Sequence, residues 1–80
     1  MPDYEDIISR IYKLLQPFVK PGTELGADSE LVTELGLTSL QVMTLIEHIE
    51  DEFDISVPLN ILPDIRTIGE LAQQLVRLVP

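Results

Sequence analysis

The stretch ELGLTSLQVMTLIEHIEDEF, residues 34–53, carries the clearest structural pattern in the chain. A glycine and two hydroxyl residues precede a run that contains neither glycine nor proline, and in this run apolar residues recur at helical spacing. At about 100° per residue, one stripe of the helix collects Val42, Leu45, Ile46, Ile49 and Phe53. The pattern therefore predicts a helix from Ser39 to Phe53 that packs this stripe against a core.

The other faces of this helix differ in polarity. The side opposite the stripe carries Gln41, Thr44, His48 and Glu52. A flank that mixes apolar side chains with carboxylates is expected to be half exposed, and it consists of Leu40, Met43, Glu47, Glu50 and Asp51. Its negative charge suits a basic protein partner and is the wrong sign for a membrane-surface helix.

Upstream of this helix, the sequence predicts another helix and then a long loop. Asp3 has the side chain of an N-cap, and apolar residues follow helical spacing from there to Gln16-Pro17. Residues 17–37 are richer in Pro, Gly, Thr, Asp and Ser, and Pro21-Gly22 is a turn signal. A connection of this length in a small domain is usually functional, and residues 29–32 have the composition of one added helical turn.

Downstream, three short patterns follow one another. Residues 55–58 alternate like a strand but have no partner strand, so an extended linker is expected. Residues 59–65 fit one short helical turn, because Pro63 limits its length. Thr67-x-x-Glu70 has the form of a capping box, and a helical stripe continues from there to Val79. This last pattern predicts a C-terminal helix.

The elements together predict an all-α protein. We expect a small four-helix bundle with three main helices, one short helix and a long first loop, and residues 1–80 forming a single domain. A chain of this length buries only roughly 60% of its unfolded surface, which leaves little room for a deep catalytic pocket. Binding is therefore a better expectation than catalysis, and we expect no enzymatic activity.

Charge and cysteine content narrow the function classes. Fourteen acidic and five basic residues give a formal net charge of −9, which repels nucleic acid and favours partners that present Lys and Arg. There is no cysteine, so any thiol chemistry must be borrowed. The acidic start lacks the features of a signal peptide, and no segment approaches the run of about 18 apolar residues that spans a membrane. We expect a cytoplasmic monomer without membrane insertion.

Ser39 is the candidate functional residue. A hydroxyl before a helix is most often a cap, but Thr38-x-x-Gln41 already has the form of a capping box. Ser39 is then left at the first helical position, beside unpaired amides at the positive end of the helix dipole. A phosphodiester attached to Ser39 would be favoured there, and Gly36 permits the sharp turn that keeps the helix end accessible.

Two other roles for polar residues are disfavoured. A nucleophilic Ser39 needs a base, but His48 lies nine residues on, about 13.5 Å along the helix axis and about 180° around it. His48 is expected to be a solvated helix residue. Asp51, Glu52 and Asp54 do not follow the spacing of a Ca²⁺ loop, so no metal site is predicted.

As a set, these residues resemble the acyl carrier and peptidyl carrier protein family. The match covers nearly the whole chain. Its residues are Leu35-Gly36-Leu37-Thr38-Ser39-Leu40, Leu45, Ile49, Glu50, Phe53, Ile55, Val57-Pro58, Thr67-Ile68 and Leu71. The combination of a glycine-containing turn, a serine at a helix start and E-x-x-F-x-I-x-[IV]-P downstream is more specific than any one of its parts.

The resemblance implies a cofactor and partners. Ser39 would receive 4′-phosphopantetheine from coenzyme A through a phosphopantetheinyl transferase, and the arm would carry acyl or aminoacyl groups as thioesters. The partners implied are a loading enzyme and downstream enzymes of fatty acid, polyketide or nonribosomal peptide biosynthesis. Their basic patches would bind the helix after the serine at Leu40, Met43, Glu47, Glu50 and Asp51, which is the mixed flank derived above. Family members can also shelter an apolar acyl chain between their helices.

Thr38 departs from the pattern of the family, in which the residue before the serine is most often Asp. Thr still caps a helix, so the departure concerns recognition by the transferase and not folding. It suggests a specialised carrier. It also motivates an alternative, an unmodified acidic module that docks on or regulates a biosynthetic enzyme.

Overall fold

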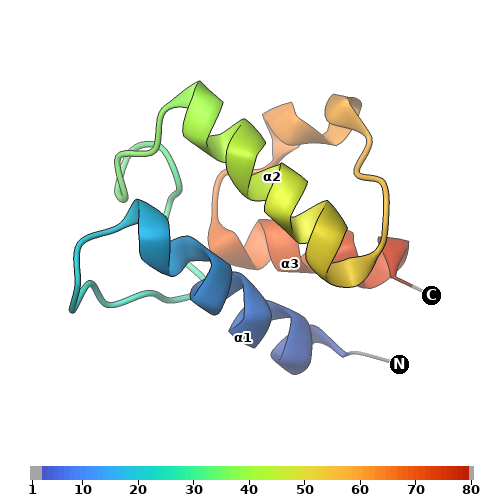
Figure 1. Ribbon diagram of the computed structural model, residues 1–80, viewed down its shortest axis with the longest axis horizontal. Coiled ribbons are helices and arrows are strands. Elements are labelled where there is room, and N and C mark those ends of the chain that lie inside the picture. Colours follow the sequence, from blue (N-terminus) through green and yellow to red (C-terminus); the bar gives the residue numbers. More distant parts are fainter. Residues whose placement is uncertain (1–2, 80) are drawn as a thin grey trace.

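The structure, a computed structural model, describes residues 3–79, so Met1, Pro2 and Pro80 lie outside the described part. Its elements in chain order are α1 (Tyr4–Leu15), the 3₁₀ helix η1 (Gln16–Phe18), α2 (Ser39–Phe53), the 3₁₀ helix η2 (Leu59–Asp64) and α3 (Ile68–Leu78) (Figure 1). The predicted helix positions and the short fourth helix are confirmed, and residues 3–79 contain no strand. None of the helices in this range is long and apolar enough to cross a membrane.

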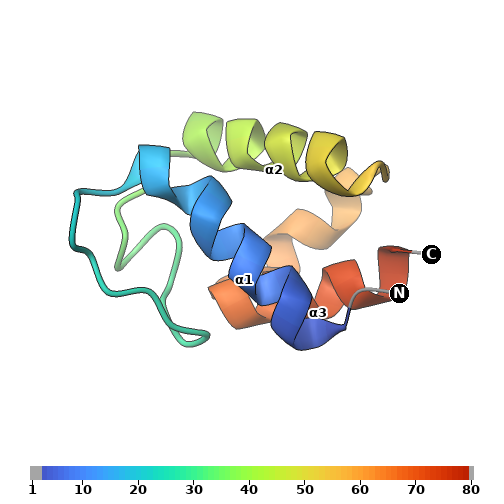
Figure 2. The same ribbon diagram turned by 60° about the horizontal axis from the view of Figure 1, so that its bottom comes forward.

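The core lies between the three α-helices. α1 packs most extensively on α3, and α2 lies beside α1 (Figures 1 and 2). Four of the five residues in the predicted α2 stripe are buried, whereas Val42 is only half-buried because it faces the groove described below. The buried apolar residues are Ile7, Ile8, Ile11, Leu15, Leu31, Leu37, Leu45, Ile46, Ile49, Phe53, Val57, Ile68, Leu71, Ala72, Leu75 and Val79.

The long loop between η1 and α2 is held against the start of α3. The amides of Ile68 and Gly69 donate to the carbonyls of Ser29 (3.0 Å) and Ala27 (2.8 Å). The Ser29 side chain, itself buried, accepts from the Gly26 amide at 3.0 Å and so fixes the turn that presents these carbonyls. The short helical turn suggested for residues 29–32 lies slightly later, because turns run over residues 31–35 and the Glu34 amide donates to the Glu30 carbonyl, four residues earlier, at 3.2 Å.

The predicted capping box of α3 is present. The Thr67 hydroxyl accepts from the Glu70 amide at 3.1 Å, and Glu70 Oε1 accepts from the Thr67 amide at 3.0 Å. The same Glu70 oxygen accepts from the Arg66 amide at 2.9 Å. These backbone hydrogen bonds lower the pKa of Glu70 below its ordinary value of 4.5.

This lowered pKa predicts an acid-sensitive contribution to stability. Because the folded state holds the ionised form of Glu70, its contribution is complete above about pH 4.5 and is lost as the pH falls through the folded pKa. Glu70→Gln should therefore be less stable than the parent at neutral pH, and the gap should shrink as the pH falls below 4.5. Urea unfolding across this pH range measures the gap, with Glu47→Gln as the control for loss of one charge. A gap for Glu70→Gln that stays constant with pH would contradict the prediction.

Candidate functional site: the start of α2 and the groove beside it

The start of α2 is closed by the predicted capping box. The Thr38 hydroxyl accepts from the Gln41 amide at 3.1 Å, and Gln41 Oε1 accepts from the Thr38 amide at 2.9 Å. Ser39 is the first residue of the helix and is exposed, and its hydroxyl takes no part in the cap. The separation of roles between Thr38 and Ser39 is therefore confirmed.

The first turns of the three α-helices differ in how well they could bind an anion, because they differ in unbonded amides and in nearby carboxylates. At α3 all four of the first amides have acceptors, two from the capping box and two from the loop carbonyls. At α1 the first turn already contains the carboxylates of Glu5 and Asp6. At α2 the first turn has no acidic residue, and within residues 3–79 no protein acceptor bonds the amides of Ser39 and Leu40. Of the three, the start of α2 is the best suited to a phosphate group.

Gly36 makes the turn that leads into this helix start. Its φ of +76° lies in the left-handed region, where residues with a Cβ are strained. Its amide donates to the Val32 carbonyl at 3.1 Å, and the Leu37 amide donates to the Leu31 carbonyl at 3.0 Å. The turn therefore sends Leu37 into the core and leaves Thr38 and Ser39 outside it.

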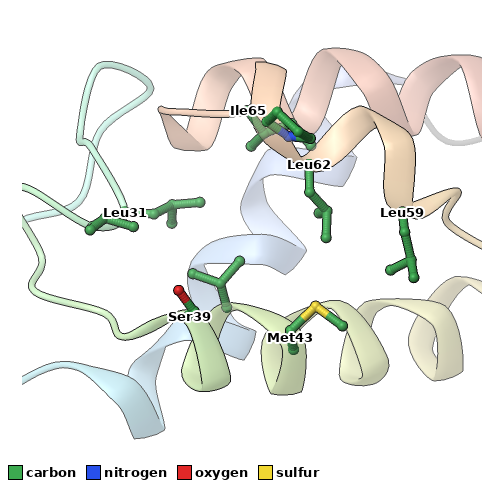
Figure 3. Close-up of a pocket in the computed structure, with 9 residues that line it drawn as sticks. Leu31, Ser39, Met43, Leu59, Leu62 and Ile65 are labelled. Carbon is green, nitrogen blue, oxygen red and sulfur yellow. The ribbon is translucent and has the colours of Figure 1, made fainter.

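An apolar groove of about 360 Å³ begins at Ser39 and runs between α2 and η2 (Figure 3). In the close-up, Leu59 and Leu62 point from η2 toward α2, where Ser39 and Met43 form part of the facing wall. Its lining residues are Leu31, Val32, Ser39, Val42, Met43, Leu59, Leu62, Pro63 and Ile65. Its volume falls within the range of roughly 300–1,000 Å³ that is usual for small-molecule sites. Ser39 is the only residue in this lining with a polar side chain.

The predicted partner-binding flank of α2 is divided by the structure. Leu40, Met43, Glu47 and Asp51 are all exposed and follow one another at spacings of three and four residues, which places them in one row. We call these four residues the outer row. Its apolar half lies next to Ser39 and its acidic half lies toward the end of the helix, over a length of about 16.5 Å.

Glu50, the fifth residue of the flank, has a contact that the helical pattern did not predict. It is half-buried, and its Oε2 accepts from the Val57 amide at 2.7 Å. Its intermediate exposure agrees with the half-exposed flank that the sequence predicts, but reversal of the charge at Glu50 would break a contact within the protein as well as change the surface charge.

Two other side chains on α2 also face the protein's own residues. Glu52 Oε2 lies 3.7 Å from Arg10 Nη1, and the Arg10 guanidinium lies 5.3 Å from the centre of the Phe53 ring. His48 is exposed, as predicted, and its ring centre lies 6.1 Å from that of Phe18. These contacts tie the second half of α2 to α1 and η1 and leave the outer row as the free acidic surface of the helix.

Comparison with known proteins identifies relatives over most of the chain. Residues 7–75 match the family model described as "Phosphopantetheine attachment site". The chain is 40% identical over 50 residues to the "Probable acyl carrier protein" of Caulobacter vibrioides, a match that covers 62% of the chain and 58% of that protein. It is 32% identical over 79 residues to the acyl carrier protein of Streptomyces coelicolor, covering 96% of the chain and 86% of the relative.

A solved structure has the same arrangement. The chain matches a structure described as "a putative acyl carrier protein" from Mycobacterium tuberculosis with a TM-score of 0.81 and 28% identity. The match covers 89% of this chain and 96% of the other.

Proposed function

The chain belongs to the acyl carrier protein family, whose cofactor is 4′-phosphopantetheine, and we propose that Ser39 is the residue to which this cofactor is attached. The observation that carries the proposal is the position of Ser39: an exposed hydroxyl that the cap does not use, beside two amides that have no acceptor among residues 3–79. Proteins of this family serve biosynthetic enzymes as carriers and generally catalyse no reaction themselves. We propose the same for residues 1–80 as a single carrier domain.

The residues around Ser39 suit the two ends of such an arm. The amides of Ser39 and Leu40 would donate to the phosphate, which no carboxylate in the first turn of α2 repels. The bound arm supplies a terminal thiol, on which an acyl or aminoacyl group is carried as a thioester. The groove beside Ser39 offers apolar surface to the cargo, and this favours an acyl chain over an aminoacyl group with a charged amine.

Modification of Ser39 is tested by intact mass. Incubation with coenzyme A and a broad-specificity phosphopantetheinyl transferase should add one phosphopantetheinyl group to the parent and none to Ser39→Ala. Thr38→Ala is the informative control, because it removes the cap but keeps the acceptor hydroxyl. It should lose about 1 kcal/mol of stability and still be modified. No gain of mass in the parent, or the same gain in Ser39→Ala, would refute the proposal.

A second candidate is an unmodified module that docks on or regulates a biosynthetic enzyme. Thr38 favours this candidate, because the residue before the serine is most often Asp in the carrier family that the sequence resembles. The mass of the protein isolated from its native host separates the two candidates. A phosphopantetheinyl group on that protein supports the carrier, whereas its absence together with failure of the transferase reaction supports the unmodified module.

A further inference from the structure

The groove wall opposite α2 is less firmly anchored than the α-helices, since its apolar residues Ile61, Leu62 and Ile65 pack against the core while only partly buried. It consists mainly of η2, which contains no buried residue, and Leu59 at its start is 62% exposed. Within and beside η2, the Ile61 and Ile65 amides donate to carbonyls only three residues earlier, at 3.3 and 3.1 Å. The hydrogen bonds at its two ends therefore add to this partial packing in setting the position of the 3₁₀ segment relative to α2.

Both ends of η2 are held by hydrogen bonds to residues outside the segment, two of them at Arg66 after it and one at Val57 before it. After the segment, the Arg66 carbonyl accepts from the Leu31 amide at 2.9 Å. Before it, the Val57 amide donates to Glu50 Oε2 at 2.7 Å, and the Val57 side chain is buried in the core. The second bond has a charged acceptor, and such bonds are stronger than those between neutral groups.

Glu50 is placed for this contact by the end of α2. Its backbone carbonyl accepts from the amides of Asp54 and Ile55, and Asp54 adopts the left-handed conformation with φ of +54°. The chain therefore reverses direction immediately after the helix and brings Val57 back beside the Glu50 side chain. One residue of α2 thus binds the returning chain through both its backbone and its carboxylate.

From these contacts we infer that Glu50 is a positioning residue of the groove. Its carboxylate holds the Val57 amide and thereby fixes the η2 wall opposite Ser39 and Met43, while Glu47 and Asp51 in the outer row remain free for a basic partner. The two kinds of carboxylate on the same helix then have different tasks. The inference rests on the proposed function only where the groove is treated as a cargo site and the outer row as a docking surface.

Amide hydrogen exchange on the complete, unmodified chain tests the inference. In Glu50→Ala, exchange at Val57 and in residues 59–64 should accelerate by about ten-fold or more relative to the amides of α1 and α3. Glu50→Gln keeps a neutral acceptor and should show a smaller, still local increase. Glu47→Ala, one turn earlier and exposed, is the control and should change neither region. Should Glu50→Ala fail to fold, the local increase in Glu50→Gln decides the test.

A second measurement separates positioning from docking. The rates at which Glu50→Gln and Glu47→Gln associate with the phosphopantetheinyl transferase are compared at low ionic strength, each variant having lost one charge. Only Glu47→Gln should be clearly slower. Unchanged exchange at Val57 in both Glu50 variants, a uniform rise over all helices, or equal slowing in the two Gln variants would overturn the inference. Failure of the transferase to modify the parent would refute the proposed function instead, and the exchange measurement would still decide the role of Glu50.

Discussion

Leu45→Ala is expected to destabilise the protein by about 2–5 kcal/mol, because Leu45 is completely buried at the centre of α2. A domain of this length has a total stability of about 4–12 kcal/mol, so the substitution removes a large part of it. The midpoint of thermal unfolding should fall by at least about 8 °C. Thermal and urea unfolding followed by circular dichroism would measure both quantities.

The matched control is Leu40→Ala, the same substitution in the same helix. Leu40 is 75% exposed, so its removal should change the stability by no more than about 0.5 kcal/mol. It should instead weaken binding to a partner enzyme, since Leu40 belongs to the outer row. Equal losses of stability in the two variants would show that the buried and exposed faces of α2 are wrongly assigned.

Reversal of the two carboxylates in the outer row should slow the association with a basic partner by about ten-fold or more at low ionic strength. The change is Glu47→Lys together with Asp51→Lys. Both side chains are exposed, and in residues 3–79 neither forms an ion pair or a side-chain hydrogen bond, so the fold should persist. The association rate with the phosphopantetheinyl transferase can be measured by stopped flow. Repeating the measurement at increasing salt would show how screening removes the electrostatic contribution to this rate.

The control for net charge is Glu5→Lys together with Glu24→Lys. These two residues are also exposed but lie in α1 and in the long loop, away from the outer row. The control pair raises the net charge by the same amount and should slow association much less. If both pairs of substitutions slow the association equally, the total charge of the protein causes the effect, and the outer row is not the docking surface.

The sequence predicted the features that depend on neighbouring residues. The capping boxes at Thr38 and Thr67 join side chains and amides only three residues apart, so their patterns are visible in the sequence and the helix starts follow from them. The buried stripe of α2 follows from helical spacing for the same reason. The placement of Ser39 outside its cap was therefore predictable before any tertiary contact was known.

The features that were not predicted depend on contacts across the fold. Glu50 bonds Val57 only because the left-handed Asp54 turns the chain back, and a helical wheel ends before that turn. The groove combines residues from the long loop, α2 and η2, so no single periodic pattern contains it. The one available signal was the presence of Leu31, Leu59 and Leu62 in segments otherwise expected to be loop or short turn. Apolar residues in such segments must find a surface to cover.

The first amides of α2 and α3 differ in where their acceptors lie, and we expect this difference to affect the order in which local contacts of the protein are lost. At α3 the capping box bonds two of the first four amides, whereas the other two depend on the carbonyls of Ala27 and Ser29, about forty residues earlier in the chain. A transient departure of the long loop would therefore expose the amides of Ile68 and Gly69. The first turn of α2 depends on Thr38 and Gln41 alone. We therefore expect a fluctuation that breaks the contacts of Ala27 and Ser29 with α3 to leave the Ser39 hydroxyl on an intact helical turn. Under the proposed function, the feature that an attaching enzyme recognises is therefore local, and we expect it to persist in partly opened states of the domain.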